Sequence, residues 1–126
     1  MWKFSKTSLN RLEGVDHRLQ DLAFKVVSEL HDCSVVYGLR KEAEQQRLVA
    51  EGLSKTMNSK HLVGRAIDLA PYPINWDNTK QFYYFAGLVL GAANELGIKI
   101  RWGGDWDMDN DLDDQTFMDL VHFELI

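Results

Sequence analysis

The stretch SKHLVGRAIDLAPY, residues 59–72, places His61 and Asp68 seven residues apart among small and apolar residues. Residues 65–70 are typical of a strand, in which alternate side chains point to opposite faces of the sheet. Asp68 then shares a face with Ala66 and Ala70, and these small neighbours leave open space in front of the carboxylate. Gly64 allows a tight turn that brings the His61 imidazole back toward the same opening. The segment therefore predicts a strand with one polar face.

The end of the chain repeats this pattern in VHFELI, residues 121–126. His122 and Glu124 fall on one face of the predicted strand, whereas Val121, Phe123 and Leu125 fall on the other and are expected in the core. Two strands thus each carry ionisable side chains opposite an apolar underside.

The remaining periodicities predict a mixture of helices and strands without regular alternation. Helices are expected at residues 15–30, 41–52 and 82–96, strands at 33–39 and 98–102, and a long acidic loop at 103–115. This order favours an α+β fold with a small, mostly antiparallel sheet and helices packed on it. A length of 126 residues predicts one domain spanning residues 1–126.

Composition excludes several partners. A net charge of -5 and a pI near 5.3 oppose nucleic-acid binding, which needs a basic surface. No segment approaches the roughly 18 apolar residues of a membrane span, and the first residues lack the apolar core of a signal peptide. The lone cysteine, Cys33, is expected to be a small buried hydrophobic residue.

The ionisable residues suggest a catalytic metal site. Two imidazoles and one carboxylate, from His61, Asp68 and His122, would give Zn²⁺ three ligands and leave a fourth position for water. Asp119, three residues before His122, is a candidate base, and Arg40 is a candidate for holding an oxyanion. Spacing alone leaves alternatives open. His61 could be a hydrogen-bonded core or surface histidine, and Asp68 could cap a loop. Arg40 could pair with an acidic neighbour on the surface, and Asp119 could be one more solvated carboxylate.

The motif SKHLVGRAID, residues 59–68, matches the SxHxxGxAxD pattern of the zinc DD-peptidase family, and DLVH, residues 119–122, resembles its (Asp/Glu)xxH element. That family includes VanY-type carboxypeptidases, VanX-type dipeptidases and phage L-alanyl-D-glutamate peptidases. YGLR, residues 37–40, and RWGGDW, residues 101–106, are similar to the phage endolysin branch. The resemblance therefore covers nearly the whole chain.

The resemblance implies roles for individual residues and a fold shared with the hedgehog signalling domain. His61, Asp68 and His122 are implied as zinc ligands, and Asp119 as the catalytic base. The family often has Glu where this chain has Asp119, which puts the geometry of the base in question. Ser59, Glu124 and Trp106 are expected to bind substrate or to support the ligands, with Glu124 orienting a ligand histidine.

The implied function is that of a phage endolysin acting on the peptidoglycan stem peptide, most simply at the bond between L-Ala and D-Glu. We expect a monomer that is made in the host cytoplasm and reaches the wall after release by a holin. A D-Ala-D-Ala carboxypeptidase of the same family is the alternative. A non-catalytic, zinc-containing binding domain and a metal-dependent nuclease are alternatives of other classes; the first would not need Asp119 and the second would want a basic surface.

The acidic loop invites a calcium interpretation. It contains Asp105, Asp107, Asp109, Asp111, Asp113 and Asp114. No frame supplies both the sixth-position Gly and the twelfth-position Glu of an EF-hand. A solvated loop is expected, with a weak Ca²⁺ site at residues 105–114 as the open alternative.

Overall fold

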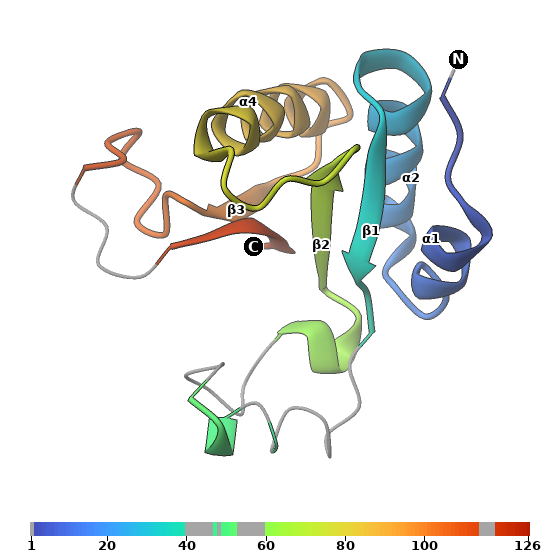
Figure 1. The fold of residues 1–126 in the computed structure, drawn as a ribbon, viewed down its shortest axis with the longest axis horizontal. Coiled ribbons are helices and arrows are strands. Elements are labelled where there is room, and N and C mark those ends of the chain that lie inside the picture. Colours follow the sequence, from blue (N-terminus) through green and yellow to red (C-terminus); the bar gives the residue numbers. More distant parts are fainter. Residues whose placement is uncertain (1, 40–46, 48, 53–59, 114–117) are drawn as a thin grey trace.

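The computed structural model describes residues 2–39, 47, 49–52, 60–113 and 118–126. Within them lies a four-stranded sheet in the order β1-β2-β4-β3, made of β1 (Cys33–Tyr37), β2 (Ala66–Pro71), β4 (Asp119–Leu125) and β3 (Ile100–Gly103) (Figure 1). All three neighbouring pairs are antiparallel. The predicted α+β class with an antiparallel sheet is confirmed. Most of the helix expected at residues 41–52 lies outside the described residues.

The helices follow the apolar periodicity of the sequence. The helix expected at residues 15–30 forms α2 (His17–Lys25), which continues into a π-helical turn, η1 (Val26–Leu30). The second long helix is α4 (Thr79–Glu95), and a short helix that the sequence analysis missed, α1 (Lys6–Arg11), precedes α2. None of the described helices is long and apolar enough to cross a membrane.

The core lies between the sheet and the helices α2 and α4. Ile67 and Leu69 of β2 and Phe123 of β4 are fully buried against Leu19 of α2 and Phe85 of α4. Burying each such side chain contributes roughly 1.5–3 kcal/mol relative to exposure. The apolar undersides of β2 and β4 are therefore what hold the two strands in place.

The pairing of β2 with β4 positions the polar faces. Asp68 lies directly opposite His122 across the ladder, although the two residues are 54 positions apart in the chain. Directly opposite residues of antiparallel strands share a face, so the register brings both side chains to the same side of the sheet. The strand β4 begins at Asp119, two residues earlier than VHFELI predicted.

Two glycines allow the end of β1 and the turn that leads into β2 to approach the helical layer closely. Gly64 follows a 3₁₀ turn, η2 (Lys60–Val63), and has a φ of 72°, a conformation that favours glycine. Its carbonyl accepts a hydrogen bond of 2.8 Å from the Asp16 backbone N–H. Gly38, just after β1, has no room for a side chain, because a Cβ there would lie 1.9 Å from the Arg11 carbonyl oxygen. These close approaches anchor η2 and the end of β1 to the helical layer.

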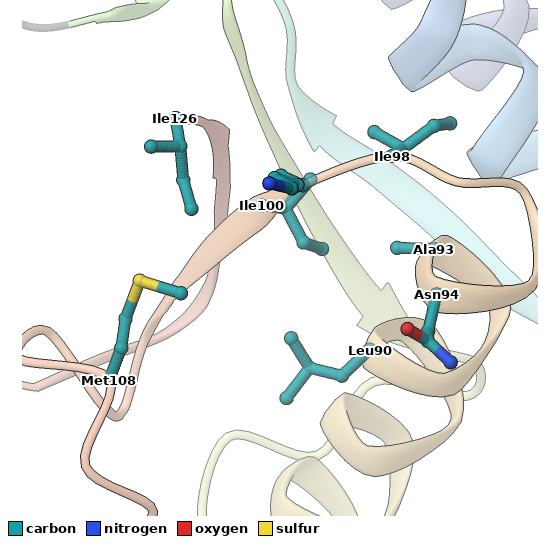
Figure 2. A pocket seen from close by; sticks show the side chains of 8 residues that line it. Leu90, Ala93, Asn94, Ile98, Ile100, Met108 and Ile126 are labelled. Carbon is teal, nitrogen blue, oxygen red and sulfur yellow. The ribbon is translucent and has the colours of Figure 1, made fainter.

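An apolar pocket of about 230 Å³ opens between α4, β3 and the end of the chain (Figure 2). Its lining includes Leu90, Ala93, Ile98, Ile100, Met108 and Ile126. None of the predicted site residues within the described part of the chain lines it. The polar faces of β2 and β4 are therefore separate from this pocket.

Candidate metal centre

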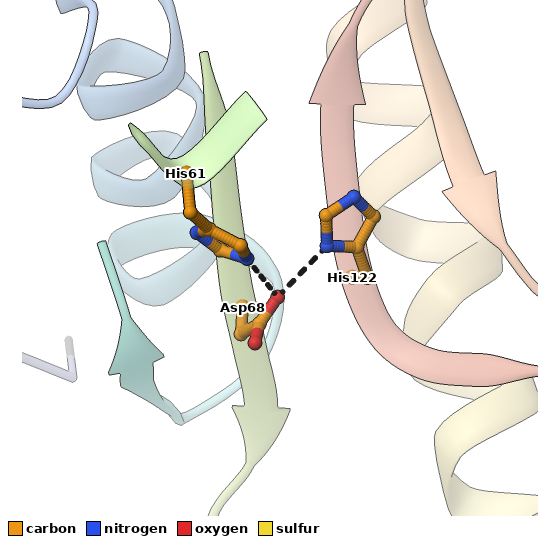
Figure 3. Close-up of side chains that lie close together, drawn as sticks. All are labelled: His61, Asp68 and His122. Carbon is orange, nitrogen blue, oxygen red and sulfur yellow. Dashed lines mark hydrogen bonds and ion pairs between the residues drawn. The ribbon is translucent and has the colours of Figure 1, made fainter. Parts of the chain in front are cut away.

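His61, Asp68 and His122 converge on one another, as the sequence predicted (Figure 3). His61 Nε2 lies 3.0 Å and His122 Nδ1 lies 3.2 Å from the same atom, Asp68 Oδ1. The ligand atoms of the three residues all lie within 4.8 Å of one another. The open space expected in front of Asp68 is filled by the two imidazole rings, which leave its exposed fraction at 5%.

The outer nitrogen of His61 has a partner that sets the tautomer of the ring. His61 Nδ1 lies 2.7 Å from the Gly38 carbonyl oxygen. A carbonyl oxygen can only accept, so Nδ1 carries the hydrogen and donates it. In the neutral ring, the lone pair is then on Nε2, the nitrogen that faces Asp68.

In His122 the two ring nitrogens have the opposite roles to those in His61. Its Nε2 lies 2.8 Å from Glu124 Oε1, so Nε2 donates to the carboxylate and the Nδ1 lone pair of the neutral ring faces Asp68. The predicted shared face of His122 and Glu124 is confirmed by this contact. Each imidazole therefore turns toward Asp68 the nitrogen that, in the neutral ring, has a lone pair free to bind a cation.

This donor set fits Zn²⁺. Bonds of about 2.0–2.1 Å in a tetrahedral site place neighbouring donor atoms about 3.3 Å apart. The two contacts to Asp68 Oδ1, 3.0 and 3.2 Å, are already close to that separation. Two nitrogen atoms and one oxygen atom also form the three-ligand composition of a catalytic zinc site with an open position.

The charges within the cluster stabilise one another. Burial by itself would raise the pKa of Asp68, but hydrogen bonds with His122 and His61 hold that pKa well below its usual range. Burial would lower the pKa of His122, whereas the hydrogen bonds with Asp68 and Glu124 raise it to about 9. The proton between His122 Nδ1 and Asp68 is the one that a metal cation would replace.

All of residues 1–126 match the family described as phage L-alanyl-D-glutamate peptidase. The chain belongs to this family. A curated relative, the L-alanyl-D-glutamate peptidase of Escherichia phage T5, is 35% identical over 135 residues, which cover 99% of this chain and 98% of the relative. The resemblance read from the two sequence motifs is therefore confirmed.

Two solved structures are similar to this peptidase. The L-Ala D-Glu endopeptidase ChiX of Serratia marcescens has a TM-score of 0.82 and 32% identity, covering 98% of this chain and 90% of its own. A variant of the vancomycin-resistance D,D-pentapeptidase VanY, in complex with Zn(II), has a TM-score of 0.53 and 17% identity, covering 86% and 68%. The second likeness shows a shared fold.

The predicted base of this peptidase, Asp119, lies at the start of β4. It pairs with Gly103 of β3, and the two strands approach so closely that a Cβ on Gly103 would lie 2.1 Å from the Asp119 carbonyl oxygen. The negative charge of Asp119 contributes to the raised pKa of His122. The carboxylate therefore acts on the centre electrostatically without belonging to the converging ligand group.

The other predicted site residues of this peptidase differ in where they lie relative to the metal centre. Arg40 and Ser59 lie outside the described residues, so their roles stay predictions. Trp106 lies beside the centre, with its ring centroid 5.4 Å from that of His122. Glu124 is buried and touches His122 directly.

Sequence reasoning missed two basic residues that reach this centre through Glu124. Arg101 Nη2 donates to Glu124 Oε2 at 2.7 Å, and Lys60 Nζ lies 3.3 Å from the same oxygen. Arg101 is opposite Glu124 in the pairing of β3 with β4. Only the register of that pair reveals the contact, whereas the position of Lys60 next to His61 in the motif was a signal visible in the sequence.

The acidic loop brings the carboxylates of Asp105, Asp107 and Asp109 within 4.8 Å of one another. Several carboxylates serve as acceptors within the loop, since Asp105 Oδ2 and Asp109 Oδ1 accept backbone N–H groups at 3.0 and 2.9 Å. Asp114 lies outside the described residues. Neither these contacts nor the named relatives support calcium, and the Ca²⁺ site stays a prediction.

Proposed function

We propose that this chain is a zinc-dependent peptidoglycan peptidase that hydrolyses the bond between L-Ala and D-Glu of the stem peptide. His61, Asp68 and His122 hold one Zn²⁺. The observation that carries the proposal is the convergence of two imidazole nitrogens, His61 Nε2 and His122 Nδ1, on one buried carboxylate oxygen. The choice of bond is supported by the family match and by relatives named as L-alanyl-D-glutamate peptidases at 35% and 32% identity.

The chain's own residues divide the chemistry between them. When bound, Zn²⁺ supplies Lewis acidity, which makes water acidic near neutral pH and polarises the scissile carbonyl. Asp119 accepts the proton of the attacking water and then gives it to the leaving amine, so one carboxylate serves as base and then as acid. Arg40, outside the described residues, is proposed to hold the developing oxyanion.

Digestion of purified peptidoglycan tests this function. We expect new amino groups to appear, with mass spectrometry showing fragments cut between L-Ala and D-Glu, and a chelator should stop the reaction. Asp119→Ala should abolish cleavage while zinc stays bound, because Asp119 is not a ligand. Asp21→Asn, which changes an exposed carboxylate on α2, is the control and should cleave normally.

Other products would identify the alternatives. Release of terminal D-Ala would indicate the D,D-carboxypeptidase. Tight zinc binding without any cleavage would indicate a non-catalytic binding domain and contradict the proposal. Nicking of plasmid DNA in the same assay would indicate the nuclease.

We also propose that this peptidase acts as a monomer on peptidoglycan alone, and that it is made in the host cytoplasm and meets the wall after a holin opens the membrane. Cells that express it without a holin should stay intact until chloroform permeabilises the membrane, and turbidity should then fall. Lysis without permeabilisation would contradict this order of events. Sedimentation of the purified chain should give a mass near 14.5 kDa.

A further inference from the structure

Four side chains, one of them His122 itself, form a closed ring of contacts. Glu124 Oε1 lies 2.8 Å from His122 Nε2, and Glu124 Oε2 accepts from Arg101 Nη2 at 2.7 Å. The Arg101 guanidinium carbon lies 5.6 Å from the centroid of the Trp106 ring, and that ring lies 5.4 Å from His122. The imidazole of His122 is thus contacted at its outer nitrogen by Glu124 and across its ring by Trp106.

A fifth residue ties this ring to the other half of the metal centre. Lys60 pairs with Glu124 Oε2 at 3.3 Å and also donates to the Leu125 carbonyl oxygen. Lys60 directly precedes His61 in η2. Glu124 therefore touches one ligand histidine itself and is linked to the other through the neighbouring residue of the chain.

We propose that Glu124 is a positioning residue that selects Nδ1 of His122 as the metal-facing nitrogen, and that Arg101 and Lys60 hold its carboxylate for that task. The inference rests on the metal site of the proposed function. It concerns the residues that support the metal ligands. The family motifs found in the sequence assign no role to Arg101 or Lys60.

The physical reason lies in the two nearly equivalent orientations of an imidazole ring. A rotation of about 180° about the Cβ–Cγ bond exchanges the positions of the nitrogen and carbon atoms at nearly the same shape, so a hydrogen-bond acceptor must choose between them. Glu124 is buried, and both of its oxygens are engaged, one by His122 and one by the two cations. The carboxylate therefore cannot turn away without leaving a buried charge unpaired.

Glu124→Gln is the direct test, because the amide has the shape of the carboxylate. Whichever way the amide turns, its NH₂ group meets either the two cations or the Nε2–H of His122, so one contact becomes repulsive. We expect Zn²⁺ affinity, measured by competition with a chromogenic chelator, to fall about 10- to 100-fold. Nitrogen-15 NMR of the histidines, recorded with zinc bound so that the ring is neutral, should show that His122 no longer keeps a single Nε2–H tautomer.

Glu95→Gln is the matched control. It removes the same charge from an exposed carboxylate, which lies 3.3 Å from Lys25. Zinc affinity and the His122 signals should stay at their original values. A loss equal to that of Glu124→Gln would mean that net charge, and not position, governs the affinity, and would overturn the inference.

Arg101→Met and Lys60→Met keep the test open if Glu124→Gln does not fold, which circular dichroism would show. Each variant leaves Glu124 one cation, so we expect a smaller fall in zinc affinity with a mixed His122 tautomer. Unchanged affinity and an unchanged tautomer in all folded variants would overturn the inference. These readouts do not involve cleavage, so failure of the proposed peptidase activity would leave them interpretable.

Discussion

The two faces of β2 are buried to the same degree but for different reasons. Ile67 and Leu69 have exposed fractions of 0% beneath the helices, and on the other face Asp68 has 5%. The first face is closed by apolar packing, whereas the second is closed by the rings of His61 and His122. Burial alone therefore does not distinguish a core position from a functional one. What distinguishes them is how the polar atoms obtain their partners.

The energetic consequences of the two faces differ. An apolar side chain gains free energy from burial itself, while a buried carboxylate loses hydration and is stable only with good partners. Asp68 obtains two histidine partners on one oxygen atom. The apolar face thus stabilises the fold, and the polar face uses that stability to hold an arrangement suited to a cation.

The largest expected effect is on the polar face. Asp68→Ala removes the one acceptor that both histidines share, so zinc binding and peptidase activity should fall below detection. Atomic absorption of the purified protein and release of amino groups from peptidoglycan would measure the two losses. A variant that retained stoichiometric zinc would contradict the geometry of the centre.

The next effect is on the apolar face, one residue along the strand. Leu69→Ala should lower the free energy of unfolding by about 2–5 kcal/mol, because it leaves a cavity beneath the helices. Urea denaturation would measure the loss. The folded fraction should bind zinc as tightly as the original chain, and weakened zinc binding there would show that the two faces are not independent.

Gly38→Ala should affect both faces together. The new Cβ would lie 1.9 Å from the Arg11 carbonyl oxygen, so the end of β1 must shift, at a cost of about 1–3 kcal/mol. The Gly38 carbonyl that accepts from His61 Nδ1 would move with it. Thermal unfolding and zinc competition should both report a loss. Gly87→Ala, in α4 where a Cβ meets nothing within 4 Å, is the control and should bind zinc normally.

The smallest effect concerns Asp16, a partly exposed carboxylate that can be compared with the buried Asp68. Hydrogen bonds from the Arg18 side chain and backbone hold the pKa of Asp16, the N-cap of α2, well below its usual value of 3.8. A lowered pKa in the folded state contributes stability that is present above the unfolded pKa and is lost as the pH falls below about 4. Asp16→Asn keeps a capping oxygen but cannot ionise.

Melting temperatures measured by circular dichroism over a pH series would test the sign. The original chain should melt slightly above Asp16→Asn near neutral pH, and the difference should shrink on acidification. A difference that grew as the pH fell would show that the ion pair with Arg18 does not stabilise the fold.

Much of the centre was predictable because its signals are local. The alternation of small and polar residues around Asp68, and of His122 and Glu124 with Phe123 between them, follows from the two-residue period of a strand. The short helix α1 was missed, since six residues carry little periodicity and its Ser5 cap is one of six serines in the chain, each of which could begin a helix. The contact of Arg101 with Glu124 could not be predicted, because the residue pattern of one strand does not reveal its register with a strand that follows some twenty residues later.

The sequence by itself determined the longer helices α2 and α4, the strands with the polar faces of β2 and β4, and the family, because these depend on local periodicity and on motifs of adjacent residues. Only the tertiary structure decided that Asp68 lies opposite His122, which nitrogen each histidine presents, and that Arg101 and Lys60 hold Glu124. The physical reason is that these features depend on strand register and on partners far apart in the chain, which the packing of the apolar faces sets.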